Sequence, residues 1–158
     1  MASVALTLLD GGAEQPSCAQ FERWLNAALT ATGQPHSEPQ ELTIQIVDDT
    51  TSAELNQHYR GKPGATNVLS FPFSAPTPQP LPILGDLAIC APLVAREAIA
   101  QGKTIESHWA HLAIHGLLHL CGYDHIDDRD ADAMESLEQQ IMAELGYPDP
   151  YQTAPDRV

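Results

Sequence analysis

Histidines are concentrated in one short stretch of the chain. Five of the seven histidines lie between His108 and His125. His115 and His119 are four residues apart, and His125 follows after a glycine, Gly122. Residues i and i+4 of a helix share one face, so two imidazoles can bind one ion there, and the glycine lets the chain turn and bring back a third. The pattern predicts a divalent-metal site of His115, His119 and His125, with zinc as the expected ion. Three protein ligands leave a fourth position for water, which is typical of catalytic rather than structural zinc.

Two further histidines lie on the same stripe of the expected helix. At about 100° per residue, His108 and His111 align with His115 and His119. We interpret both as buried histidines held by hydrogen bonds. The alternative is that they support the metal ligands without binding the ion themselves, and His111 is the candidate for this role. Asp124 has two equal interpretations, because it could orient an imidazole or cap the turn.

The residue after the first ligand separates this pattern from zinc peptidases that share its spacing. In those peptidases a glutamate directly follows the first histidine and serves as the general base. Here that residue is Gly116. Metallopeptidase activity is therefore only a minor alternative.

A second group of candidates lies in an expected glycine-rich loop over residues 60–64. Arg60 and Lys62 stand there, ahead of an expected strand over residues 68–73. Both side chains can bind phosphate oxygens, the arginine through its bidentate fork. On composition alone, two ordinary solvated cations are the favoured interpretation.

Alternating strands and helices must position these residues. Apolar and β-branched runs predict strands, and apolar residues at helical spacing predict helices that begin near Ser17, Thr51, Pro92 and Thr104 and one around Met134. We expect an α+β fold (an α/β-type sandwich) in which a mixed sheet of about four strands packs with about five helices. The histidine helix, capped by Thr104 and ending near Leu120, is apolar outside its stripe and is expected to be the central, buried helix. Residues 1–147 are expected to form a single domain and residues 148–158 a flexible C-terminal tail. The expected strands cover residues 4–9, 42–47, 68–73 and 84–90.

Composition narrows the class of protein. The formal net charge is -14, from 7 Lys and Arg against 21 Asp and Glu, which argues against a broad basic surface for nucleic acid. Three cysteines without a CxxC pair predict reduced thiols. The start of the chain lacks the basic region of a signal peptide, and no apolar run reaches the length of a membrane span. We expect a cytoplasmic protein without a membrane partner.

Several motifs together resemble the YbeY-type endoribonuclease family, whose members are bacterial rRNA maturation factors. The resemblance covers about residues 42–145, with the motifs in the same order. One departure is Asn67, where the family usually shows an aspartate, so a general-base role at this position is not expected here. The motifs are HGLLHLCGYDH at 115–125, YRGK at 59–62, TNVLSFP at 66–72 and GDLAIC at 85–90.

The resemblance implies a function. It implies a single-strand-specific, metal-dependent endoribonuclease, a hydrolase of RNA phosphodiester bonds that acts in 16S rRNA 3′-end maturation and ribosome quality control. His115, His119 and His125 would be the catalytic zinc ligands and Arg60 the functional arginine. The implied partners are the 16S rRNA precursor and the ribosome or its proteins, and no DNA. A non-catalytic ribosome-assembly factor with a structural zinc site stays open as the alternative.

Overall fold

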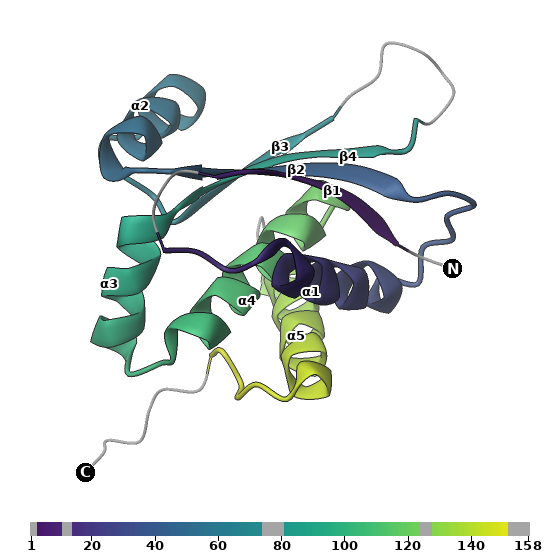
Figure 1. The fold of residues 1–158 in the computed structure, drawn as a ribbon. Helices are drawn as coiled ribbons and strands as arrows, with labels where there is room; N and C mark the ends of the chain where they lie inside the picture. The colour runs from purple at the N-terminus through teal and green to yellow at the C-terminus, as the bar shows by residue number, and fades with distance from the viewer. Residues whose placement is uncertain (1–2, 11–13, 74–80, 124–127, 152–158) are drawn as a thin grey trace.

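The computed structural model describes residues 3–10, 14–73, 81–123 and 128–151. In these residues four strands and five helices follow one another in the predicted order, which confirms the α+β fold with a mixed sheet (Figure 1). No described helix has the length and apolar composition needed to cross a membrane. The elements are β1 (Val4–Leu9), α1 (Cys18–Ala31), β2 (Gln40–Val47), α2 (Asp49–Arg60), β3 (Val68–Pro72), β4 (Ile83–Cys90), α3 (Ala91–Gln101), α4 (Ile105–Leu120) and α5 (Asp128–Leu145).

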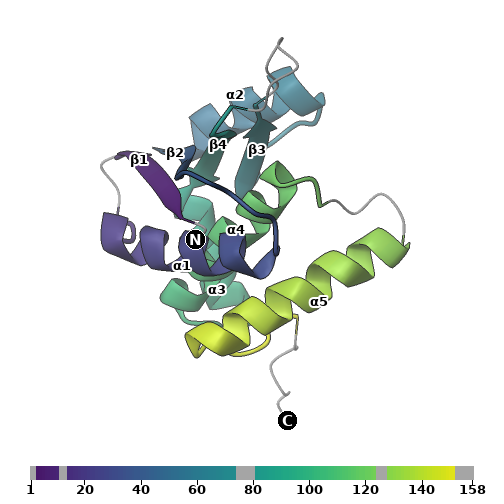
Figure 2. The ribbon, with the colours of Figure 1, turned by 90° about the vertical axis from the view of Figure 1, so that its right-hand side faces the viewer.

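The sheet is mixed, with strand order β1-β2-β4-β3. Strands β1, β2 and β4 run parallel, and β3 pairs antiparallel with β4 at one edge. This edge suits the β3 sequence because Pro72 has no N–H to donate to a further strand. Helices α1, α3, α4 and α5 lie on one side of the sheet and α2 lies on the other (Figures 1 and 2).

Helix α4 is the central helix, and nearly all of its side chains are buried. The Thr104 side chain caps it by accepting a hydrogen bond from the backbone N–H of Ser107 at 3.1 Å, as the sequence predicted. Of its residues from Ser107 to Leu120, His115 and His119 alone are more than marginally exposed. The predicted buried histidine helix is therefore confirmed, and its two partly exposed residues are the two predicted ligands.

The boundaries of α2 differ from the prediction. We expected this helix to begin at Thr51, but its cap is Asp48, whose carboxylate accepts the backbone N–H of Thr51 at 2.8 Å. The helix also continues through Arg60, which we had assigned to the following loop, and it ends at Gly61 in the left-handed conformation (φ 66°). Arg60 is thus held by the last helical turn.

Gly116 of α4 packs directly against Leu87 of β4. A Cβ atom at this position would stand 2.7 Å from Cδ2 and 2.9 Å from Cδ1 of Leu87, a fully buried residue of β4. A glutamate at position 116 would therefore point into the core rather than toward the histidines. The packing gives a physical reason for the absence of the peptidase general base.

We predict that Gly116→Ala destabilises the protein. Overpacking against Leu87 costs about 1–3 kcal/mol, while alanine favours the helix by only about 1 kcal/mol. Urea unfolding of the single variants and of the double variant with Leu87→Val gives the coupling between the two sites. Gly116→Ala should cost less in the Leu87→Val background, and a stabilising Gly116→Ala would contradict the packing argument.

Candidate metal centre

The structure brings two of the three predicted ligands together. The Nε2 atoms of His115 and His119 face one another at 3.1 Å, with ring planes at 83°. Two nitrogen ligands of tetrahedral zinc, each about 2.0–2.1 Å from the ion, lie about 3.3 Å apart. The pair therefore fits a zinc ion. His125, the third predicted ligand, and Asp124 lie outside the described residues, and their roles stay predictions.

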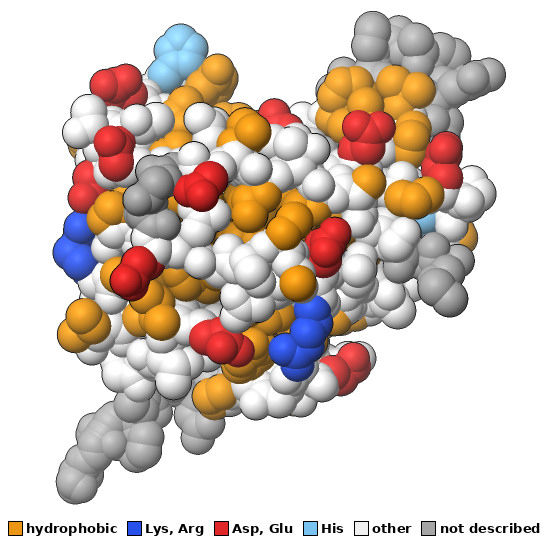
Figure 3. Space-filling model, viewed as in Figure 1, with side chains coloured by type: hydrophobic (Ala, Val, Ile, Leu, Met, Phe, Trp, Pro, Cys, Tyr) orange, Lys and Arg blue, Asp and Glu red, His pale blue; other side chains and the backbone are white. Residues whose placement is uncertain are grey.

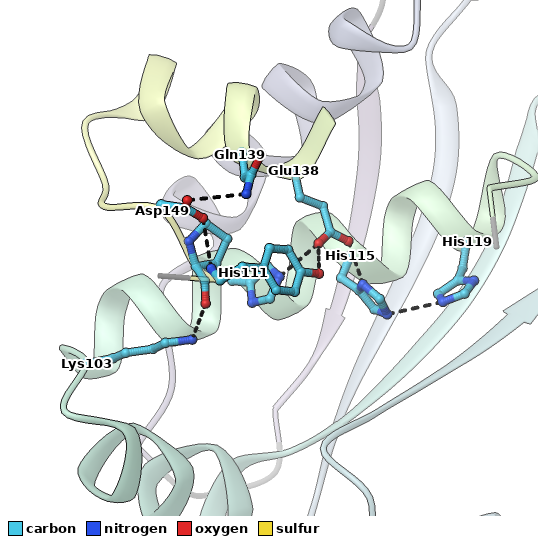
Figure 4. Close-up of polar contacts among 9 residues, drawn as sticks. Lys103, His111, His115, His119, Glu138, Gln139 and Asp149 are labelled. Atoms are coloured by element: carbon cyan, nitrogen blue, oxygen red, sulfur yellow. Dashed lines mark hydrogen bonds and ion pairs between the residues drawn. The ribbon is translucent and has the colours of Figure 1, made fainter. Parts of the chain in front are cut away.

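A buried carboxylate lies on the far side of His115. Glu138 of α5 has no exposed surface, and its Oε2 accepts a hydrogen bond from His115 Nδ1–H at 2.5 Å (Figure 4). Its Oε1 accepts one from His111 Nε2–H at 3.0 Å. Because an ionised carboxylate only accepts, the ring nitrogens that face it carry the protons. His115 then presents Nε2 as its metal-binding atom, a common arrangement for histidine ligands.

Glu138 is charged at neutral pH in spite of its burial. Burial alone raises the pKa of its carboxyl, but the hydrogen bonds from His111 and His115 outweigh this effect and lower the pKa to about 2. Since the folded-state pKa lies below the unfolded one, the contribution to stability is present above about pH 4.5 and is lost as the pH falls toward 2. His111 and His115 therefore have a negatively charged partner throughout the neutral pH range.

The same network contains a second group of side chains that could bind a metal ion. Nitrogen atoms of His111 and His115 and an oxygen of Glu138 lie within 4.8 Å of one another, close enough to be considered for one ion. However, 2.5 Å between His115 Nδ1 and Glu138 Oε2 fits a proton between them and is shorter than the spacing of two ligands on one zinc ion. The distances favour the pair of His115 and His119 for the metal and Glu138 for its support.

Glu138 is the residue that sequence reasoning missed. It stands on the apolar stripe of α5 between Met134 and Ile141, both fully buried. A glutamate on the buried face of an amphipathic helix needs a partner. The position of a glutamate on the apolar stripe of α5 was the signal in the sequence that could have identified Glu138.

A groove of about 890 Å³ runs beside the histidine pair. His115 and His119 line it, and so does Arg60 from the end of α2. No acidic side chain is among its described lining residues, and Lys62, exposed in the following loop, does not line it. The groove is therefore locally cationic in an acidic protein. The remaining lining residues are Tyr59, Thr66, Asn67, Val68, Leu69, Ser70, Phe71, Pro72, Gly122 and Tyr123.

On the face shown in Figure 3, acidic side chains are scattered and the visible Lys and Arg side chains form no continuous patch. One of the described cations, Arg96, is paired with Asp49 at 2.8 Å. The groove lined by Arg60 and the histidine pair is thus the candidate site for an anionic substrate.

Hydrogen bonds from polar side chains of α2 hold the segment between Arg60 and β3 against the helix. Ser52 Oγ donates to Thr66 O at 2.7 Å and accepts from Thr66 N–H at 2.9 Å. Asn56 Nδ2–H donates to Gly64 O at 2.9 Å. These bonds tie the loop after α2 back onto the helix, which fixes Arg60 relative to the β3 side of the groove.

Asn67 is held by a hydrogen bond that its family-typical counterpart could not make. Its Nδ2–H donates to Glu97 Oε1 at 3.0 Å, and the same oxygen accepts from His108 Nε2–H at 2.8 Å. Burial lowers the pKa of His108 more than Glu97 raises it, so the neutral ring is favoured. His108 is thus a hydrogen-bonded buried residue away from the histidine pair, and Asn67 has a structural role.

The mixed sheet, the buried helix α4 and the groove lined by His115 and His119 define an α+β protein with a candidate metal centre. A family model described as "Endoribonuclease YbeY" matches residues 12–146, and the chain belongs to this family. The solution structure of TM1509 from Thermotoga maritima has a similar fold, with a TM-score of 0.57 and 23% sequence identity over 94% of this chain and 99% of that one. The family membership supports a nuclease that acts in rRNA processing.

We predict different effects of the two histidine partners of His115 on metal binding. His119→Ala should lower zinc affinity by at least about tenfold more than His111→Ala, because the first removes a ligand and the second only a supporting side chain. Competition with a chromophoric chelator measures both. The reverse order would favour the group of His111, His115 and Glu138 as the ligand set.

We also predict that Asn67→Asp is destabilising at neutral pH. Two carboxylates about 3 Å apart repel until one takes up a proton, so the pKa of the pair rises on folding. The penalty, about 1–3 kcal/mol, should be largest near pH 7 and shrink as the pH falls toward 4. Urea unfolding at several pH values measures it.

Asn26→Asp is the matched control for this experiment. Asn26 Oδ1 only accepts, from the backbone N–H of Val4 at 2.8 Å, and a carboxylate can replace it. If Asn67→Asp and the control had equal stabilities at pH 7, the structural role of the amide would be wrong.

Proposed function

We propose that this protein is a zinc-dependent, single-strand-specific endoribonuclease that acts in 16S rRNA 3′-end maturation and ribosome quality control in the cytoplasm. The observation that carries the proposal is that Arg60 and the pair of His115 and His119 line one groove. Family membership supports the choice of RNA as the substrate. The ribosome or its proteins are the proposed partners.

Each part of the groove has a task in phosphodiester hydrolysis. His115, His119 and the proposed third ligand His125 would hold a divalent ion, which would supply Lewis-acid chemistry and lower the pKa of a bound water. The Arg60 guanidinium binds the non-bridging oxygens and stabilises the negative charge that develops on them. The last turn of α2 holds the backbone of Arg60 beside the groove, and its exposed side chain lines the groove. Asn67 takes no proton, because its amide is bonded to Glu97.

Aromatic rings on the groove support single-stranded RNA. Tyr59 is 61% exposed and packs edge-on against Phe71, with ring centroids 5.0 Å apart. Exposed aromatic faces stack unpaired bases. Because Arg60 follows Tyr59 directly, a base on the ring would place its phosphate near the guanidinium.

The charge balance predicts how RNA binds. With 21 acidic against 7 basic residues, affinity for free RNA should be weak and should fall steeply with salt. Lys62, near Arg60 in sequence, is proposed as an auxiliary phosphate contact. Docking on the ribosome would then supply the remaining affinity.

We predict that Arg60→Ala and His115→Ala fail in different ways. Arg60→Ala should cleave single-stranded RNA about 10²-fold more slowly with unchanged zinc content, and Arg60→Lys should recover part of the loss. His115→Ala should lose both activity and zinc. Cleavage of a labelled oligonucleotide, with metal analysis of the same samples, measures both.

Arg23→Ala is the control for loss of a cation. Arg23 lies on α1, donates to Leu145 O at 3.1 Å and does not line the groove. The activity of Arg23→Ala on single-stranded RNA should equal that of the wild type. If both groove variants cleaved RNA normally, the nuclease assignment would fail. A zinc-loaded, inactive wild type that loses stability on chelation would instead favour a non-catalytic assembly factor.

A further inference from the structure

The buried carboxylate of Glu138 accepts hydrogen bonds from three side chains. Besides the imidazoles of His111 and His115, the hydroxyl of Tyr151 donates to its Oε1. Three donors from two segments therefore converge on one charge between α4 and α5 (Figure 4). A carboxylate that accepts three hydrogen bonds is fixed in orientation, and its burial is compensated without a metal ion.

Tyr151 belongs to a short segment after α5 that is itself anchored. We name residues Asp149–Tyr151 the C-terminal strap. Lys103 Nζ, at the start of the α4 region, donates to Pro150 O at 2.8 Å, and Gln139 Nε2–H donates to Asp149 Oδ2 at 3.3 Å. Pro150 is buried. The strap is therefore bonded both to α5 and to the chain just before α4. It lies within residues 148–158, which we predict to be a flexible C-terminal tail. Residues 149–151 of that range are held by these contacts, and for residues 152–158, which lie outside the described part, flexibility stays a prediction.

The strap also contacts the network of His111, His115 and Glu138 through Tyr151. The ring of Tyr151 packs edge-on against His111, with centroids 5.2 Å apart and planes at 84°. Burial and the neighbouring Glu138 raise the pKa of the Tyr151 phenol, so it remains protonated and can donate. The ring and its hydroxyl thus hold His111 and Glu138 in one arrangement.

We propose that Glu138 is a positioning residue for the metal centre and that the C-terminal strap, through Tyr151, holds Glu138 in place. This inference rests on the metal site of the proposed function. A neutral imidazole has two tautomers, and the bond from Nδ1–H to Glu138 keeps the proton of His115 away from the nitrogen that faces His119. The negative charge also makes that nitrogen a better ligand. Zinc affinity consequently depends on a tyrosine beyond the last helix.

The first test is zinc affinity of the metal-free proteins, measured by chelator competition. Glu138→Gln should bind zinc about 10- to 100-fold more weakly. Tyr151→Phe keeps the ring on His111 and removes only the donor, so its affinity should lie between those of Glu138→Gln and the wild type. Glu144→Gln, an exposed substitution on the same helix, should match the wild type.

The second test separates positioning from a general loss of structure. The ¹⁵N chemical shifts of the His115 ring in metal-free protein report the tautomer. The wild type should show the Nδ1–H form, and Glu138→Gln should show a mixture of the two forms. Because Glu138→Gln alters a buried site and could fail to fold, Tyr151→Phe provides the same comparison with a smaller change.

Three results would overturn the proposal. The first is wild-type zinc affinity in both Glu138→Gln and Tyr151→Phe. The second is an equal loss in Glu144→Gln. The third is a complete loss in Glu138→Gln while His119→Ala binds normally, since Glu138 would then be a ligand itself. Failure of the proposed function is distinguishable, because a wild type that binds zinc through this network but does not cleave RNA contradicts only the activity.

Discussion

A buried helix that carries four imidazoles must provide a partner for each of them, because an unsatisfied polar group in the interior costs about 1–3 kcal/mol. Two carboxylates from different helices supply hydrogen-bond partners to three of these imidazoles. Glu97 of α3 serves His108, and Glu138 of α5 serves His111 and His115. The packing of the helices around α4 is thus tied to the chemistry of its histidine stripe.

The stripe also divides the helix by function. His108 and His111 are enclosed by protein, whereas His115 and His119 reach the groove bounded by β3 and the end of α2. The single face that points at solvent is where a metal and an anionic substrate can meet. An acidic protein can therefore have a locally cationic site without a basic surface.

The sequence predicted the elements better than the contacts between them. The cap at Thr104 and the apolar run that follows are local signals, so α4 was predicted over its full length. The start of α2 was missed because Asp48 and Thr51 are both good capping residues, and only the backbone geometry selects Asp48. Arg60 was placed in a loop because Gly61 was interpreted as a loop residue rather than as the left-handed end of the helix.

The partners of the site were harder to predict, since they are distant in sequence. His115 and Glu138 are 23 residues apart, and no periodicity within either helix reveals which face meets the other. The charge on the apolar stripe of α5 indicated a buried partner, but the choice of partner depends on how the helices pack. The interaction of Tyr151 with Glu138 has no local signal at all.

The order of the elements along the chain has a consequence for the assembly of the centre. The groove residues, among them Arg60, His115 and His119, precede α5, whereas Glu138 lies in α5 and Tyr151 follows it. During synthesis from the N-terminus, a chain that has reached only α4 carries His111 and His115 without the carboxylate that orients them. The proposed metal centre is therefore complete only after α5 and the strap have emerged, so a chain that ends after α4 would lack a competent site even if its sheet had formed.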